Sequence, residues 1–459
     1  MYQIDFKHPA HIYFVGIGGI SMSGLAEILR EEGFQVSGSD KQHSPLTQFL
    51  ENKGVSIFYG QRKDNITPDI DCAVFTSAIH PDNPEYIAVK EQNIPFLSRA
   101  ELLGQIMKNY RTPIAISGTH GKTTTTSMIS EILLSAKLDP TLSIGGILKS
   151  INGNIHVGKS EYFVAEACEY TNSFLSFFPR IGIILNIEED HLDFFKDLAD
   201  IRNSFHRFAE LLPKDGALII NGDIENVTEL TKDLCCKVIT VGHTSSSDYY
   251  YTDVTYNNMG CPSFTLHGPS DQTQRLSLNV PGEHNVYNAM TAFAVSDILE
   301  ISRTIAANAL LVFHGTDRRF EYKGTIGGVT IIDDYAHHPT EITATLKAAS
   351  NYPHKTIWCV FQPHTYTRTI TFMKEFAEAL SLADKVVLAD IYASRETDTL
   401  GISSRDLQKK VQSLGKDCYY FPSFDEIESF LLQNCINGDL LITMGAGDVV
   451  KVGENLIGY

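Results

Sequence analysis

The chain has 459 residues, 43% of them hydrophobic and 20% charged, a composition typical of soluble globular proteins. A chain of this length is too long to fold around one ordinary hydrophobic core, so we expect two to four domains. The formal net charge of -18 argues against a general nucleic-acid binder or a membrane-surface protein, because both need a basic face. No secretory signal and no apolar run near the ~18 residues of a membrane span is visible. The eight scattered cysteines fit reduced thiols in the cytoplasm.

The first predicted elements are an apolar strand over 11–15, a glycine-rich turn, a helix over 25–32 and a strand over 34–37 that leads to Asp40. This order opens a Rossmann-like unit, with the diphosphate of a ligand on the turn and the acid near its ribose or base. Serine stands where the dinucleotide fingerprint has its last glycine, so we favour a nucleotide other than NAD. Alternatively, the glycines only permit close packing of helix and strand. The candidate substrate-binding residues here are Gly16, Gly18, Gly19, Ile20, Ser21 and Asp40.

A further apolar strand, predicted over 73–79, ends in small polar residues. Because ligands bind at the carboxyl ends of strands in open α/β sheets, Ser77 joins the substrate-binding candidates. Ser98 and Glu101 have the spacing of a capping box and predict the start of a helix. We expect residues 108–113 to link this unit to the next.

The second unit opens with a strand over 113–116, a small-residue turn and a helix that starts at Lys122. A helix N-terminus behind a glycine turn binds phosphate through backbone amides and the helix dipole. Lys122 can reach the terminal phosphates, and the Thr123 hydroxyl can bind Mg2+. The loop is shortened, since Ile116 stands where the usual pattern has its first glycine, and a mere helix start is the alternative. The candidate nucleotide-binding residues are Gly118, Thr119, His120, Gly121, Lys122, Thr123 and Thr124.

Two later strands deliver polar side chains to the same sheet edge. The strand over 162–165 leads to Glu166, and the strand over 181–185 leads to Asn186 and His191. Parallel strands end on one edge, so Glu166 and His191 can converge near the phosphate loop. This predicts a Mg2+ site formed by Thr123, Glu166 and His191. Histidine is unusual for Mg2+, so it contacts a second metal or only water; a surface carboxylate and a helix-start histidine are the alternatives.

Residues 243–274 predict a small antiparallel sheet, and a helix over 290–299 follows a Pro-Gly turn that carries Asn285. A third α/β region has polar residues after each strand. Its arginines are the cations that we expect to meet phosphate or carboxylate, although an exposed Arg-Arg pair is often only solvated. The predicted strands cover 329–332, 358–361, 386–390 and 440–443, and the arginines are Arg318, Arg319 and Arg368.

These motifs together resemble the Mur ligase family of peptidoglycan synthesis, over the whole chain and in the family's three-domain order. The resemblance is carried by residues 16–27, 117–124, 186–193, 284–285, 318–320, 333–339 and 362–368. It implies an α/β fold of three domains: a Rossmann-like UDP-sugar-binding domain, a central phosphate-loop ATPase-like domain with a small antiparallel sheet, and a C-terminal Rossmann-like domain that closes over the site and binds the amino acid. We expect boundaries at 1–109, 110–316 and 317–459.

The resemblance implies a ligase that joins L-alanine to the lactoyl carboxylate of UDP-N-acetylmuramate. ATP activates the carboxylate as an acyl phosphate, and Mg2+, or Mn2+ in its place, assists. By the same resemblance Lys122, His191, His338 and Arg368 act in catalysis, while Asn285, Arg319 and Asp334 contact the nucleotide. The implied partners are these three small molecules, without nucleic acid or membrane, in a cytoplasmic monomer or homodimer.

Four other classes of function are open to test. The stretch 16–27 speaks against a related ligase that acts on recycled peptides or on amino-acid polymers, and a UDP-sugar requirement would decide. A GTP switch would carry an Asn-Lys-x-Asp pattern, which does not follow the phosphate loop. An NAD oxidoreductase would leave Lys122 unexplained, and an inactive UDP-sugar binder would not keep the whole ATP set.

Overall fold

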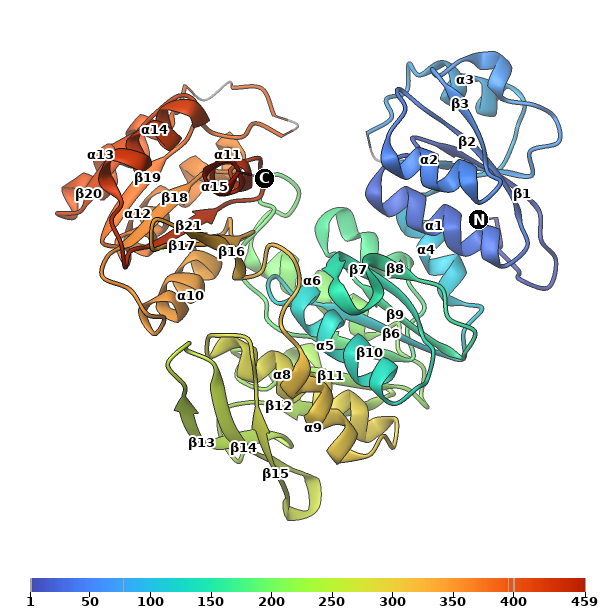
Figure 1. Cartoon of the computed structure of the whole chain (residues 1–459). Coiled ribbons are helices and arrows are strands. Elements are labelled where there is room, and N and C mark those ends of the chain that lie inside the picture. Colours follow the sequence, from blue (N-terminus) through green and yellow to red (C-terminus); the bar gives the residue numbers. More distant parts are fainter. Residues whose placement is uncertain (1, 77, 395, 399–400, 459) are drawn as a thin grey trace.

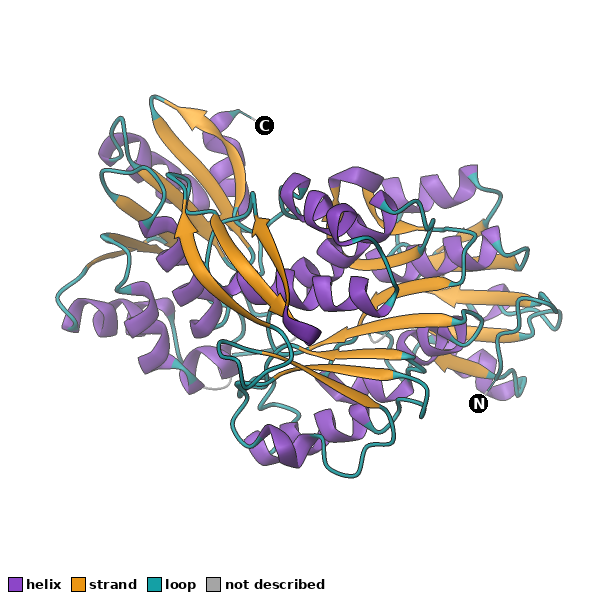
Figure 2. Ribbon diagram, turned by 90° about the horizontal axis from the view of Figure 1, so that it is seen from below, coloured by secondary structure: helices purple, strands orange, loops and turns teal. Residues whose placement is uncertain are grey.

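The computed structural model describes residues 2–76, 78–394, 396–398 and 401–458, and Ser77 therefore lies outside the described residues. Three α/β units follow one another along the chain (Figure 1). The N-terminal unit (blue) and the C-terminal unit (orange to red) lie on either side above the central unit. Helices lie on both sides of the sheets (Figure 2), and the predicted α/β class is confirmed.

The N-terminal unit is a parallel five-stranded sheet in the order β3-β2-β1-β4-β5. Its elements are β1 (His11–Val15), α1 (Ile20–Glu31), β2 (Gln35–Asp40), α2 (Pro45–Asn52), β3 (Ser56–Tyr59), β4 (Cys72–Phe75), α3 (Pro84–Glu91), β5 (Phe96–Ser98) and α4 (Arg99–Met107). The capping box of α4 is present: Ser98 Oγ accepts from the Glu101 amide at 3.2 Å, and Glu101 accepts from the Ser98 amide at 2.7 Å. This order places the glycine turn after β1 and Asp40 at the end of β2, side by side at the carboxyl edge.

Two predicted boundaries in this unit are wrong. Helix α1 begins at Ile20, not at residue 25, and residues 22–25, which lie before or at the predicted start, are already buried. A Cβ at Gly24 would lie 2.3 Å from the Ile155 side chain, so the glycine, a poor helix former, permits this contact. Strand β4 ends at Phe75 rather than at residue 79, since the chain turns after Thr76, whose carbonyl accepts from the Ile79 amide.

The central unit is a seven-stranded sheet in the order β12-β11-β10-β6-β9-β7-β8, parallel except for β8. The predicted antiparallel sheet is confirmed as β13-β14-β15. The elements are β6 (Thr112–Ser117), α5 (Lys122–Ser135), β7 (Thr141–Leu148), β8 (Gly153–His156), β9 (Tyr162–Glu166), β10 (Ile181–Ile184), α6 (Leu198–Ala209), β11 (Ala217–Asn221), α7 (Val227–Leu230), β12 (Lys237–Val241), β13 (Tyr250–Tyr256), β14 (Pro262–Gly268), β15 (Gln272–Ser277), α8 (His284–Ile298) and α9 (Arg303–Val312).

The C-terminal unit is a six-stranded sheet in the order β16-β17-β21-β18-β19-β20, with only β16 antiparallel. Its elements are β16 (Glu321–Ile326), β17 (Val329–Asp334), α10 (Pro339–Ser350), β18 (Ile357–Phe361), α11 (Tyr366–Thr371), α12 (Met373–Leu380), β19 (Lys385–Leu388), α13 (Ser404–Ser413), β20 (Asp417–Tyr420), α14 (Phe424–Asn434), β21 (Leu440–Met444) and α15 (Val450–Ile457). Its two hydrophobic clusters contain only residues of this unit.

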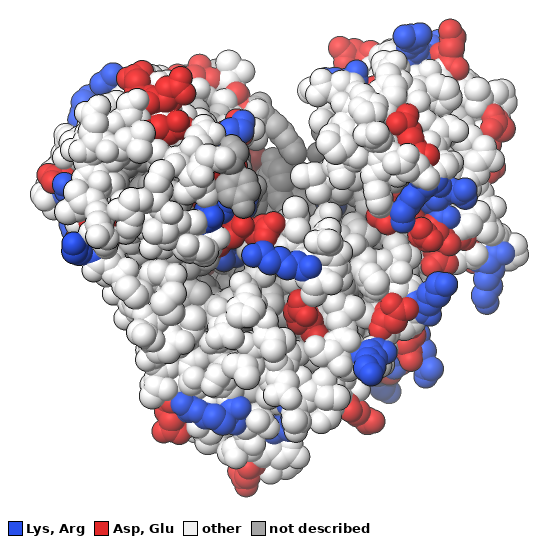
Figure 3. Space-filling model, viewed as in Figure 1, with Lys and Arg blue, Asp and Glu red and all other residues white. Residues whose placement is uncertain are grey.

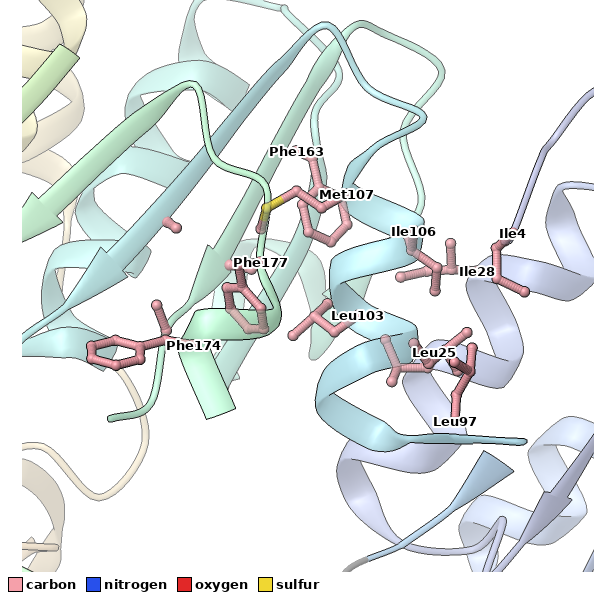
Figure 4. Packing of buried hydrophobic residues seen from close by; sticks show 14 of the residues in the cluster. Ile4, Leu25, Ile28, Leu97, Leu103, Ile106, Met107, Phe163, Phe174 and Phe177 are labelled. Carbon is pink, nitrogen blue, oxygen red and sulfur yellow. The ribbon is translucent and has the colours of Figure 1, made fainter. Parts of the chain in front are cut away.

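The N-terminal and central units share one hydrophobic core. Leu103 and Met107 of α4 pack toward Phe163 and Phe177 of the central unit (Figure 4). The two surfaces approach so closely that a Cβ at Gly104 would lie 1.9 Å from the Ser176 carbonyl oxygen. The N-terminal and central units are therefore held in a fixed relation, and a hollow separates the N-terminal from the C-terminal unit in Figure 3. None of the helices in the described part of the chain has the length and the apolar run needed to cross a membrane.

Candidate functional site

The glycine turn of the N-terminal unit is fixed by the end of β2. Asp40 Oδ2 accepts from the Gly18 amide at 2.7 Å, and the Ser39 carbonyl accepts from the Gly16 amide at 2.9 Å. Gly16 has a φ of +84°, and a Cβ at Gly18 would lie 2.8 Å from the Asp40 carboxylate, so both positions require glycine. No side chain caps α1 behind Gly19. The first amides of α1 therefore remain available for an anion.

The phosphate loop joins β6 to α5. Gly118 and Gly121 have φ values of +139° and +83°, and no side chain caps α5. Asn186, directly after β10, braces the loop from the neighbouring strand: its Oδ1 accepts from the His120 amide at 2.7 Å, and its Nδ2 donates to the His120 carbonyl at 3.1 Å. This bracing holds the loop open around the N-terminus of α5, the geometry that binds phosphate.

Lys122 lies over the loop itself. Its ammonium donates to the carbonyls of Gly118 and Thr119 and pairs with Glu169 at 3.1 Å. Burial would lower the pKa of Lys122, but the Glu169 carboxylate outweighs it, and the pKa is raised. The lysine therefore stays charged. Sequence analysis missed Glu169, although it follows the predicted strand end at Glu166 by only three residues.

Thr123 and Glu166 lie together beside the loop. The Thr123 hydroxyl donates to Glu166 Oε2 at 3.2 Å, and the Gly145 amide donates to the other carboxylate oxygen. Burial raises the pKa of Glu166, against the charges of Arg319 and Lys122. Hydroxyl and carboxylate oxygens are the ligands that Mg2+ prefers, so these two predicted residues fit that ion.

His191 opens on a different cavity, of about 570 Å3, between the central and C-terminal units. Its ring stacks on Tyr170, with centroids 4.4 Å apart, and its Nε2 lies 3.6 Å from Asp190. In the described part of the chain no hydrogen bond or ion pair joins it to Thr123 or Glu166. The same cavity is lined by Arg368, which donates from Nε and Nη2 to Asp190 Oδ1 at 3.1 and 2.8 Å.

Three other predicted residues surround one cavity of about 230 Å3 next to the phosphate loop: Asn285, Arg319 and Asp334. Asn285 is oriented by the Pro281 carbonyl, to which its Nδ2 donates at 2.8 Å. Helix α8 begins at His284, six residues before the predicted start, because such hydrogen bonds hold its first turn. Predicted residues His120, Gly121 and Thr124 complete the wall on the loop side.

Asp334 is buried and accepts three hydrogen bonds, from the amides of Phe320 and Ala336 and from the Thr345 hydroxyl. Burial raises its pKa to about 6, although Arg319 opposes the rise. Arg318 differs from the expectation. Its guanidinium pairs with buried Asp333 at 3.0 Å and donates to two backbone carbonyls inside the C-terminal unit, so its role is structural.

The C-terminal unit contacts the central unit directly at the phosphate loop. His120 Nδ1 lies 3.1 Å from Glu341 Oε1, and Thr340 donates to Glu188. His338, a predicted catalytic residue, lies at the N-cap of α10, and its Nε2 is 3.1 Å from the Glu189 carbonyl. The structure thus brings His338 to the phosphate loop and Arg368 to the neighbouring cavity.

The structure thus has three units in a row: a central unit with the phosphate loop, an N-terminal unit whose glycine turn is of the nucleotide-binding kind, and a C-terminal unit that contacts the loop. Family models match all three: the Mur ligase family catalytic domain over 11–111, the Mur ligase middle domain over 116–296 and the Mur ligase glutamate ligase domain over 318–447. The chain belongs to the Mur ligase family.

Individual relatives are similar over their whole length. UDP-N-acetylmuramate–L-alanine ligase of Lachnospira eligens is 59% identical, with 100% of both chains covered. The enzyme of the same name from Clostridium botulinum strain Loch Maree is 49% identical over 97% of each chain. The crystal structure of UDP-N-acetylmuramate-alanine ligase from Thermotoga maritima matches with a TM-score of 0.80 and 29% identity, covering 97% of this chain and 98% of that one. A murein peptide ligase from Psychrobacter arcticus matches with a TM-score of 0.71 and 25% identity, over 98% of both chains.

Proposed function

We propose that this chain is an ATP-dependent ligase that joins L-alanine to the lactoyl carboxylate of UDP-N-acetylmuramate in peptidoglycan precursor synthesis. The observation that carries the proposal is the phosphate loop, closed on one side by Asn285, Arg319 and Asp334, in a chain 59% identical to a relative of that name. ATP and UDP-sugars are cytoplasmic metabolites, and we assign the protein to that compartment.

The proposed division of labour follows the three units. Residues 1–109 bind the UDP-sugar on the glycine turn, with Ile20, Ser21 and Asp40 around it. Residues 110–316 bind ATP, and residues 317–459 bind the amino acid and close over both. The uncapped N-termini of α1 and α5 support this division, because each offers free amides to a phosphate group.

In the first proposed step the lactoyl carboxylate attacks the γ-phosphorus and forms an acyl phosphate and ADP. Lys122 leaves Glu169 to contact the transferring phosphoryl group, and the amides of the loop stabilise its charge. Thr123 and Glu166 would hold Mg2+, and His191 a second ion. Bound there, Mg2+ would screen the repulsion between carboxylate and phosphates.

In the second proposed step the neutral alanine amine attacks the acyl carbon, and the tetrahedral intermediate expels phosphate. Arg368 and His338 lie where the C-terminal unit meets the loop, next to the reacting groups. Water would hydrolyse an acyl phosphate, so the C-terminal unit must be docked before the first step. The polar contacts of His120, Glu188 and Asp190 with that unit support such a docked state.

The test is phosphate release from ATP and Mg2+ in the presence of UDP-N-acetylmuramate, with and without L-alanine. We expect release only with both substrates and a product heavier by one alanine residue. A murein tripeptide in place of alanine is the discriminating arm, because a peptide ligase is among the similar structures. Release that prefers the tripeptide, or that needs no UDP-sugar, would refute the proposal.

A further inference from the structure

Three potential metal ligands meet where the phosphate loop contacts the C-terminal unit. They are His120 of the loop, Glu188 after β10 and His338 at the start of α10. Their ligand atoms all lie within 4.8 Å of one another, and in the described residues no other group of three His, Cys, Asp or Glu side chains meets that condition. The set is distinct from Thr123, Glu166 and His191.

The unpartnered ligand atom of this cluster is the Nε2 of His120. This atom is buried and has no hydrogen-bond partner. Glu188 Oε2 lies 3.4 Å away, without hydrogen-bond geometry. A tetrahedral zinc ion with bonds of about 2.0–2.1 Å separates its ligand atoms by about 3.3 Å, so this spacing suits two ligands of one ion.

Neighbouring polar contacts orient the side chains of His120 and Glu188. Glu341 Oε1 lies 3.1 Å from His120 Nδ1 and orients the ring so that Nε2 faces Glu188. A carboxylate behind a ligating histidine is the usual support of zinc sites. Thr340 donates to Glu188 and fixes that carboxylate in turn. The rings of His120 and His338 are 4.7 Å apart between centroids, and an ion bound by His338 would take the place of the Glu189 carbonyl, which lies 3.1 Å from its Nε2.

We propose that, in the absence of nucleotide, this cluster binds one transition-metal ion of the Zn2+ class. Two imidazoles and one carboxylate select such an ion over Mg2+, which prefers oxygen ligands. Because His120 and Glu188 belong to the central unit and His338 to the C-terminal unit, the bound ion ties the closing unit to the phosphate loop. Zn2+ therefore holds the molecule docked and competes with ATP.

The first measurement is a Co2+ titration of the tag-free full chain without Mg2+ and nucleotide, followed by the visible absorption of tetrahedral Co2+ and by displacement with Zn2+. We expect one ion per chain and no thiolate charge-transfer band. Glu188→Gln should weaken the affinity by at least about 10-fold, because losing a ligand costs no less than losing one of the outer partners that orient ligands. Glu189→Gln is the matched control: the neighbouring carboxylate is exposed, and only its backbone carbonyl contacts His338.

The second measurement is small-angle scattering in an Arg368→Ala background, which loses the ion pair with Asp190 and should be open. Zn2+ should compact this protein and its Glu189→Gln derivative but not its Glu188→Gln derivative. Absence of binding, a thiolate band, or equal affinity in both variants would overturn the proposal. The first of these results would mean that a protonated His120 bridges Glu188 and Glu341 instead. Metal binding is read without turnover, so the outcome does not depend on the proposed ligase activity.

Discussion

At the scale of single residues, the main finding is that Lys122 already has partners. Its ammonium is held by two carbonyls of the loop and by Glu169, which is 3% exposed. In the proposed ATP complex, phosphates would therefore replace Glu169 as the counter-charge of Lys122. The lysine is preorganised over the loop rather than extended into solvent, which lowers the cost of ordering it.

Replacing Lys122 tests whether the two proposed nucleotide sites act independently. We expect Lys122→Ala to lower turnover by at least ~100-fold, because a cation on the transferring phosphoryl group is lost. UDP-sugar binding, measured by calorimetry without ATP, should stay nearly unchanged, since the glycine turn belongs to another unit. Lys214→Ala, an exposed lysine of the central unit, is the control. An equal loss of turnover and UDP-sugar affinity would contradict the division of labour.

Candidate site residues were predictable from sequence where a local sequence pattern contains them. The strand-turn-helix order indicated Lys122 and Thr123, and the structure places Arg319 and Asp334 across the same cavity from the loop. The pairing of Asp190 with Arg368 was not predictable, because a contact across 178 positions depends on how the units dock. The pairing of Glu169 with Lys122 was missed within one unit, because it depends on how the chain folds after β9. Acidic residues after strands are common, and sequence alone does not choose among them.

At the scale of secondary-structure elements, most apolar strands and the helix starts at Ser98 and Lys122 were predicted, whereas two other helix starts were not. The first strand was predicted at its observed bounds. Helices α1 and α8 start five and six residues earlier than predicted. Their first turns contain serine, glycine or asparagine, which favour caps and loops by intrinsic propensity. Tertiary packing at Gly24 and hydrogen bonds at Asn285 override that preference.

Asp334 ties three elements together and gives a pH-dependent prediction. Its pKa in the folded protein, about 6, exceeds the ordinary value, so its ionisation costs stability as pH rises between the two values. Asp334→Asn removes this dependence. Relative to the variant, the wild type should lose roughly 1–1.5 kcal/mol of unfolding free energy between pH 5 and pH 7.5.

The readout is urea unfolding followed by the fluorescence of Trp358, the only tryptophan of the chain and a buried residue of the C-terminal unit. The variant should also be less stable at every pH, because its amide group faces a buried backbone N–H that needs an acceptor. A difference between the two proteins that does not change with pH would refute the assignment.

At the scale of the whole molecule, the C-terminal unit is attached by polar contacts. In the described residues no buried hydrophobic cluster joins it to the rest of the chain. Among the ion pairs that join this unit to the central unit in the described residues, the most enclosed is Arg368 with Asp190, whose side chains are both 9% exposed. Removing one partner of such an ion pair is strongly destabilising, because the other charge is left buried without a counter-charge.

Removing the cation should therefore open the nucleotide-free molecule. We expect Arg368→Ala to cost the docked arrangement about 3–5 kcal/mol and to raise the radius of gyration in small-angle scattering. Trp358 fluorescence should stay native, which would show that the unit itself remains folded. Lys374→Ala, at an exposed pair of the same unit, should change neither value. An unchanged radius of gyration in Arg368→Ala would mean that other contacts hold the unit.

The core shared by the N-terminal and central units has a consequence for denaturation. Three units in the architecture correspond to two cooperative blocks in thermodynamic terms, because Leu103, Met107, Phe163 and Phe177 cannot lose their packing on one side alone. The N-terminal unit should not melt by itself, and a fragment ending before residue 110 would expose the apolar face of α4. Heat should release the C-terminal block and the remaining 1–316 block as two events, not three.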